Sequence, residues 1–144
     1  MMYWDTSAVV KLYAREQDSG YFLNLIAGTD EQVVTSAIAS MELFCALERK
    51  ERSGDIKPGG AGTAFDQFLN DIRRGRIIEI PYGHYVIQEA RKLIEPVSRR
   101  RILIRTLDRI HIASAVAVKA TWVVATDSRL RQVASLANLK LFPD

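Results

Sequence analysis

The sequence has one cysteine and two histidines among its 144 residues. A lone Cys45 excludes an internal disulfide framework and a cysteine-based zinc cluster, and His84 and His111 do not make up the set that zinc prefers. No uncharged apolar run approaches the roughly 18 residues of a membrane-spanning helix, and the N-terminus lacks the basic and apolar blocks of a signal peptide. We therefore expect a soluble, cytoplasmic protein without a membrane partner.

A strong excess of one charge is also lacking. There are 20 basic and 17 acidic residues, and the net charge of +3 alone is only a weak sign of nucleic-acid binding. No glycine-rich phosphate loop with its lysine is present, which disfavours nucleotide hydrolysis by that route. The 48% of hydrophobic residues can build a core, and the length is that of one ordinary domain. We expect residues 1–144 to form a single domain.

Short β-type runs alternate with longer helical patterns along the chain. Strands are predicted over Met2–Trp4, Gln32–Thr35, Ile77–Ile80, Trp122–Ala125 and Leu139–Phe142. Helices are predicted over Ala8–Glu16, Ser19–Ala27, Ala37–Arg52, Gly62–Arg74, Tyr85–Arg100, Thr106–Lys119 and Ser128–Leu136. This alternation is typical of an α/β fold with a mostly parallel sheet covered on both faces. The segment 53–62, with four glycines and a proline, is the expected mobile loop.

Four of the acidic residues lie in apolar surroundings. Asp5 is the only charge in the first ten residues, Glu42 the only charge from 33 to 47, and Asp127 the only charge from 120 to 128. Asp108 heads an apolar helical stripe that continues through Ile112. Since Asp5 and Asp127 follow predicted strands, they fall where open parallel sheets bind their ligands.

Each of these acids also has a structural interpretation. Asp5 could help to start a helix, Asp127 could be the N-cap of the last helix, and Asp108 could be stabilised by a helix dipole. Glu42 is harder to explain in this way, because it lies mid-helix among apolar residues and a buried lone carboxylate is costly.

A shared cation would explain the four acids together. Unneutralised carboxylates that converge would repel one another, and Mg²⁺ and Mn²⁺ prefer oxygen ligands. His111, three residues after Asp108, has a spacing that suits a ligand, but packing or hydrogen bonding in a helix interface is the favoured interpretation.

The residues around these acids resemble a known family, the PIN-domain ribonucleases, and within it the VapC-like toxins of type II toxin–antitoxin modules. The resemblance is carried, in the same order along the chain, by YWDTSAVVKLY, TSAIASMELFCALERKERSGDI, IRTLDRIHIASAV and VVATDSRL. It implies a three-layer α/β/α sandwich and a quartet of Asp5, Glu42, Asp108 and Asp127 that coordinates Mg²⁺ or Mn²⁺. Ser7 matches the family's hydroxyl near metal and phosphate, with a helix cap as its alternative role. The resemblance also implies an RNA substrate, a homodimer and a small antitoxin that covers the active site.

One position departs from the family pattern. The last block usually reads T-x-D after the strand, whereas here Ala125 takes the place of the threonine and Thr126 lies next to Asp127. If that hydroxyl orients a ligand or water, the local geometry around Asp127 is altered.

The functional hypothesis is therefore a metal-dependent endoribonuclease that acts as a toxin, with arginines such as Arg105 and Arg109 positioning the phosphate backbone. Two alternatives remain open: a non-catalytic RNA-binding or protein-interaction module on the same scaffold, and a metal-dependent phosphatase or nuclease with a different substrate.

Overall fold

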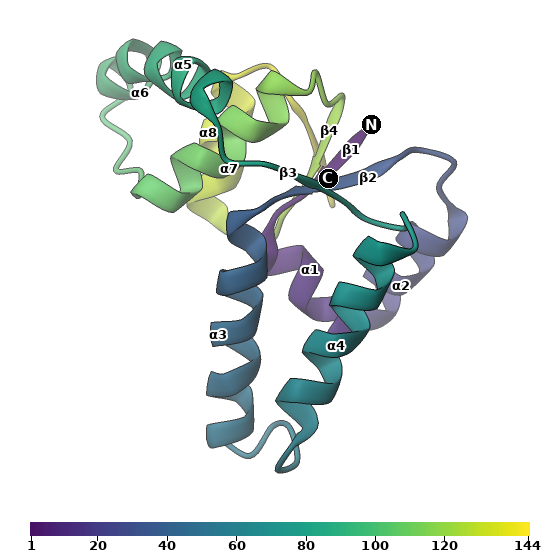
Figure 1. The fold of residues 1–144 in the computed structure, drawn as a ribbon. Helices are drawn as coiled ribbons and strands as arrows, with labels where there is room; N and C mark the ends of the chain where they lie inside the picture. Colours follow the sequence, from purple (N-terminus) through teal and green to yellow (C-terminus); the bar gives the residue numbers. More distant parts are fainter.

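A five-stranded parallel sheet runs through the middle of the molecule (Figure 1). The computed structural model describes residues 1–144. The strands are β1 (Met2–Trp4), β2 (Val33–Ser36), β3 (Ile78–Ile80), β4 (Trp122–Val124) and β5 (Lys140–Phe142). Their order is β3-β2-β1-β4-β5, and every neighbouring pair is parallel. The predicted α/β class is confirmed, and each strand lies within one residue of its predicted bounds.

Helices cover both faces of this sheet, with α1–α4 on one side and α5–α8 on the other (Figure 1). The helices are α1 (Thr6–Tyr13), α2 (Ser19–Gly28), α3 (Ile38–Arg52), α4 (Gly60–Arg73), α5 (His84–Lys92), α6 (Ile94–Arg99), α7 (Thr106–Ala117) and α8 (Ser128–Leu136). Met2 and Trp4 enter the core beneath α1–α4, whereas Tyr3 between them enters the opposite core. This alternation within one strand makes the predicted α/β/α sandwich. The helices are too short or too polar for any of them to span a bilayer.

Two predicted segments differ from the structure. The helix expected over residues 85–100 is broken at Leu93, because Pro96 has no N–H for the carbonyl four residues earlier and its ring crowds that carbonyl. The expected loop at 53–62 is shorter than predicted, since α4 already begins at Gly60. The Glu51 carboxylate accepts hydrogen bonds from the backbone N–H of Gly59 at 3.1 Å and of Ala61 at 2.8 Å, which fixes this helix start.

The sheet topology marks where a ligand is expected. From β1 the chain proceeds to β2 and β3 on one side and then crosses over to β4 and β5 on the other. The connections therefore diverge between β1 and β4, and open α/β sheets bind ligands at the carboxyl ends of such strands. Asp5 directly follows β1, and Asp127 lies three residues after the end of β4.

Candidate active site

The four predicted acids line one cavity of about 310 Å³ at this end of the sheet. Its lining consists of Asp5, Thr6, Ser7, Val10, Glu42, Ala46, Arg49, Arg105, Asp108 and Asp127. The structure therefore brings together Ser7 and all four acids, from four distant parts of the chain. No three metal-binding side chains are gathered closely enough to hold an ion as they stand.

Asp5 is fixed at the junction of β1 and α1. Its backbone N–H donates to the Val124 carbonyl at 3.0 Å, and its Oδ2 accepts from the backbone N–H of Ser7 at 3.0 Å. Asp5 is thus the N-cap of α1, as the structural interpretation allowed, and the helix begins at Thr6, two residues before the predicted start. The side chain is buried, so its orientation is set by the fold.

Asp127 has the corresponding place at the start of α8. Its Oδ1 accepts hydrogen bonds at 3.0 Å from two backbone N–H groups in the first turn, which confirms the predicted N-cap. The other oxygen, Oδ2, lies 3.8 Å from Nη2 of Arg105. One carboxylate oxygen therefore serves the helix, and the second remains available at the cavity.

Ser7 joins these two junctions. Its Oγ accepts a hydrogen bond from the backbone N–H of Thr126 at 3.0 Å, and the α1 cap is Asp5, so a cap role for Ser7 is wrong. The departure from the family pattern also has a structural form here. Ala125 is completely buried in the core, whereas Thr126 is exposed and contacts Ser7 through its backbone.

Glu42 finds its partner in His111. Nε2 of His111 lies 2.5 Å from Oε1 of Glu42, and the Thr6 hydroxyl donates to the same oxygen at 2.8 Å. On the other side of the ring, Nδ1 lies 2.6 Å from the Tyr3 hydroxyl. His111 is only 1% exposed, which agrees with its predicted place in the interior. The pairing itself was missed, although a costly buried carboxylate and a lone histidine in an apolar helix are the signals that could have suggested it.

This network shifts the pKa values of both partners. Burial alone would raise the pKa of Glu42, but the hydrogen bonds from His111 and Thr6 lower it below its ordinary value. Burial alone would lower the pKa of His111, but the hydrogen bond to Glu42 and the nearby charge of Asp5, 3.4 Å away, raise it. The pair thus favours a charged histidine facing a charged carboxylate.

Asp108 is the acid with the least compensation. Burial raises its pKa, and the negative charges of Asp127 and Asp5 act in the same direction against the attraction of Arg105. Arg105 Nε lies 3.5 Å from Oδ2 of Asp108, but this buried oxygen has no hydrogen-bond donor. The Arg105 side chain is 62% exposed, so solvent weakens this ion pair.

Each of the four carboxylates keeps an oxygen to which no protein group donates a hydrogen bond. These oxygens are Oδ1 of Asp5, Oε2 of Glu42, both oxygens of Asp108 and Oδ2 of Asp127. Hard divalent cations bind such oxygens, and the donor set therefore fits Mg²⁺ or Mn²⁺.

Two arginine positions were predicted beside the site, and the structure separates them. Arg105 lines the cavity, whereas Arg109 does not and has a buried Nη1 without a hydrogen-bond partner. Arg49, which sequence reasoning missed, lines the cavity from α3, seven residues after Glu42 and so on the same helix face. It forms no ion pair with the protein.

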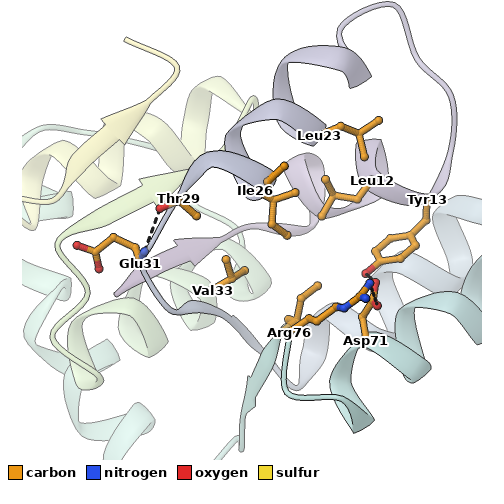
Figure 2. Close-up of a pocket in the computed structure, with 11 residues that line it drawn as sticks. Leu12, Tyr13, Leu23, Ile26, Thr29, Glu31, Val33, Asp71 and Arg76 are labelled. Atoms are coloured by element: carbon orange, nitrogen blue, oxygen red, sulfur yellow. Dashed lines mark hydrogen bonds and ion pairs between the residues drawn. The ribbon is translucent and has the colours of Figure 1, made fainter.

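A larger cavity of about 500 Å³ lies elsewhere, between α1, α2 and the start of β2 (Figure 2). Its lining is mainly apolar, with a polar corner in which the Tyr13 hydroxyl donates to Asp71 at 2.8 Å and Arg76 pairs with Asp71 at 3.3 Å. None of the predicted site residues lies there. Chemistry, and not cavity size, therefore identifies the candidate site.

Comparison with known proteins bears on this geometry. The model of the family described as PIN domain matches residues 2–136. A search of curated proteins gave no match.

Solved structures of similar fold include three toxin–antitoxin proteins. VapBC2 from Rickettsia felis, bound to a DNA fragment from its promoter, has a TM-score of 0.71 and 19% identity over 98% of this chain and 97% of that chain. VapC20 from Mycobacterium tuberculosis, a sarcin–ricin loop cleaving toxin, has a TM-score of 0.70 and 17% identity over 92% and 94%. VapBC-1 from nontypeable Haemophilus influenzae has a TM-score of 0.69 and 14% identity over 98% and 96%. At these identities the similarity demonstrates a shared fold.

The His111–Glu42 pair predicts how stability changes with pH. Because the pKa of His111 is raised on folding, the folded protein binds this proton more tightly than the unfolded chain does. The free energy of unfolding in the presence of chelator should therefore fall as the pH rises through the raised pKa of His111, within the range of about pH 6 to 9. Urea unfolding at several pH values measures it.

His111→Gln should lose this pH dependence, whereas His84→Gln should keep it, since His84 is exposed and remote from the pair. Equal slopes in wild type and His111→Gln would show that the pair does not control stability in this range.

Proposed function

The chain belongs to the PIN domain family, and from this membership and its site we propose that it is a divalent-metal-dependent endoribonuclease. We further propose that residues 1–144 work as one domain and as the toxin of a type II toxin–antitoxin module. The observation that carries the proposal is the set of four carboxylates around one cavity, each with an oxygen free of hydrogen bonds.

Asp5, Glu42, Asp108 and Asp127 would hold the cation. A bound Mg²⁺ or Mn²⁺ supplies a water of lowered pKa and neutralises charge that develops on the leaving oxygen. The buried Oδ2 of Asp108 supports this assignment, because it lacks any donor and its carboxylate is destabilised by burial. A positive ion would favour the charged form of that carboxylate.

His111 and Thr6 would act on Glu42 as positioning residues. Their bonds to Oε1 fix the carboxylate and leave Oε2 free. Such outer partners commonly orient metal ligands and tune their basicity. The Tyr3 hydroxyl on Nδ1 fixes the far side of the imidazole ring.

Three cavity residues would contact the RNA backbone. The Ser7 oxygen accepts from Thr126, so its own hydrogen can be donated to a phosphate oxygen. Arg49 and Arg105 are exposed at the cavity, and guanidinium groups bind phosphate through paired hydrogen bonds. With four acids gathered at the cation, 20 basic residues face 13 acidic ones on the rest of the molecule, which favours a polyanionic substrate.

The partners proposed are RNA, a cognate antitoxin and a second copy of the chain. Support comes from the similar structures, two of which are VapBC complexes and one of which is a toxin that cleaves the sarcin–ricin loop. The alternative is a non-catalytic RNA-binding or protein-interaction module on the PIN scaffold. It has less support, because no member of the acidic quartet is missing here.

We predict that the purified chain cleaves RNA only with Mg²⁺ or Mn²⁺, and that Asp5→Asn lowers the cleavage rate by more than about 100-fold. Loss of a direct ligand should exceed the 10- to 100-fold effect of losing an outer partner. Cleavage of labelled RNA with and without chelator measures this. In cells, induction should arrest growth, and Glu42→Gln should relieve the arrest.

Asp55→Asn is the matched control, because Asp55 is exposed in the turn before α4 and outside the cavity. Cleavage that persists in chelator, or in Asp5→Asn at the wild-type rate, would contradict the enzyme proposal and favour a binding module.

Arg49→Ala is expected to raise KM for RNA about 10-fold with little change in kcat, because it removes a charge-assisted contact to phosphate. Steady-state kinetics on a labelled RNA measures both constants. Arg52→Ala, on the same helix but outside the cavity, serves as the control for net charge. Identical KM values for the two variants would exclude a specific role for Arg49.

A further inference from the structure

The turn that carries Asp127 is very short. Only Ala125, Thr126 and Asp127 separate the end of β4 from the start of α8. Three residues leave little freedom, so the place of the Asp127 carboxylate depends on how the backbone of this turn is held. Ser7 holds it on the side of the cavity by accepting the Thr126 N–H.

Arg131 holds the turn on the opposite side. Its Nη1 donates to the carbonyl of Ala125 at 2.9 Å and to that of Phe142 at 3.1 Å, and its Nη2 donates to the carbonyl of Pro143 at 2.6 Å. The Phe142 carbonyl also accepts the Ala125 N–H at 3.1 Å. One side chain thus ties together the turn, the end of β5 and α8.

The chemistry of these contacts calls for an arginine. The three carbonyls lie where β4 and β5 end, so the sheet supplies no further N–H groups to them, and unpaired carbonyls in a half-buried place are costly. A planar guanidinium can donate to several acceptors at once in a fixed geometry. Arg131 forms no ion pair, although Asp127 is four residues earlier on the same helix face.

We propose that Arg131 is a positioning residue for Asp127: through the Ala125 carbonyl it fixes the turn that presents the carboxylate to the cation. This rests on the proposed function. It also gives the C-terminal strand a role in the site, since Phe142 and Pro143 hold the other end of the same guanidinium.

Electrostatics separates positioning from a simple charge effect. Removing a positive charge near a cation site should tighten cation binding by Coulomb's law. Loss of positioning should weaken it, by about 10-fold if Arg131 behaves as other outer partners of metal ligands do. The two effects have opposite signs.

The test is the dissociation constant for Mn²⁺ alone, measured by electron paramagnetic resonance of free Mn²⁺ with the full chain prepared free of metal. Arg131→Gln should raise the constant about 10-fold. Arg129→Gln, which removes the same charge from an exposed side chain of α8, should leave it unchanged or lower it slightly. Arg131→Lys, which keeps the charge without the planar fork, should lie between wild type and Arg131→Gln.

A double-mutant cycle locates the effect. In an Asp127→Asn background, Arg131→Gln should change the Mn²⁺ constant less than about twofold, because the carboxylate it positions is gone. An undiminished effect in that background would overturn the inference, and so would equal constants for wild type and Arg131→Gln. If Arg131→Gln does not fold, Arg131→Lys decides by the same criteria.

Absence of saturable Mn²⁺ binding in wild type would contradict the proposed function as a whole. Normal wild-type binding with an unaffected Arg131→Gln would contradict this inference alone. A lower free energy of unfolding with an unchanged Mn²⁺ constant would assign Arg131 a purely structural role.

Discussion

Repulsion between carboxylates is the constraint on which the rest of the site depends. Four acids face one partly buried cavity, and each is compensated in a different way: Asp5 and Asp127 by helix N-termini, Glu42 by His111 and Thr6, and Asp108 only by an exposed arginine. The compensation is incomplete, as the raised pKa of Asp108 shows. A site built in this way is under electrostatic stress without a cation, and that stress favours cation binding.

The fold creates this concentration of charge through its topology. Crossover connections leave β1 and β4 in opposite directions, so the residues that follow the two strands meet at one edge of the sheet. The turns at this edge are short and cross-linked, with Ser7 bonded to Thr126 and Arg131 bonded to Ala125. Asp5 and Asp127 are consequently placed by backbone geometry, whereas Glu42 is placed by side-chain bonds from the neighbouring helix α7.

Much of this could be predicted from the sequence, because apolar periodicity and strand-end position depend on local pattern. The strands, the sandwich and the four acids were found in that way. The pairing of Glu42 with His111 joins residues 69 positions apart, and no local pattern encodes it. The break at Leu93 was missed although Pro96 signalled it, and Arg49 and Arg131 were missed because arginines on helices are usually solvated. Their roles depend on which cavity or carbonyls the tertiary fold brings within reach.

The central claim is that the four carboxylates share a cation, and anomalous diffraction from crystals grown with Mn²⁺ tests it most directly. The account predicts an anomalous peak within the cavity, in contact with oxygens of Asp5 and Asp108, and its loss in Asp5→Asn crystals. A cavity that remains without a peak at millimolar Mn²⁺, with the carboxylates still bonded only to protein groups, would contradict it.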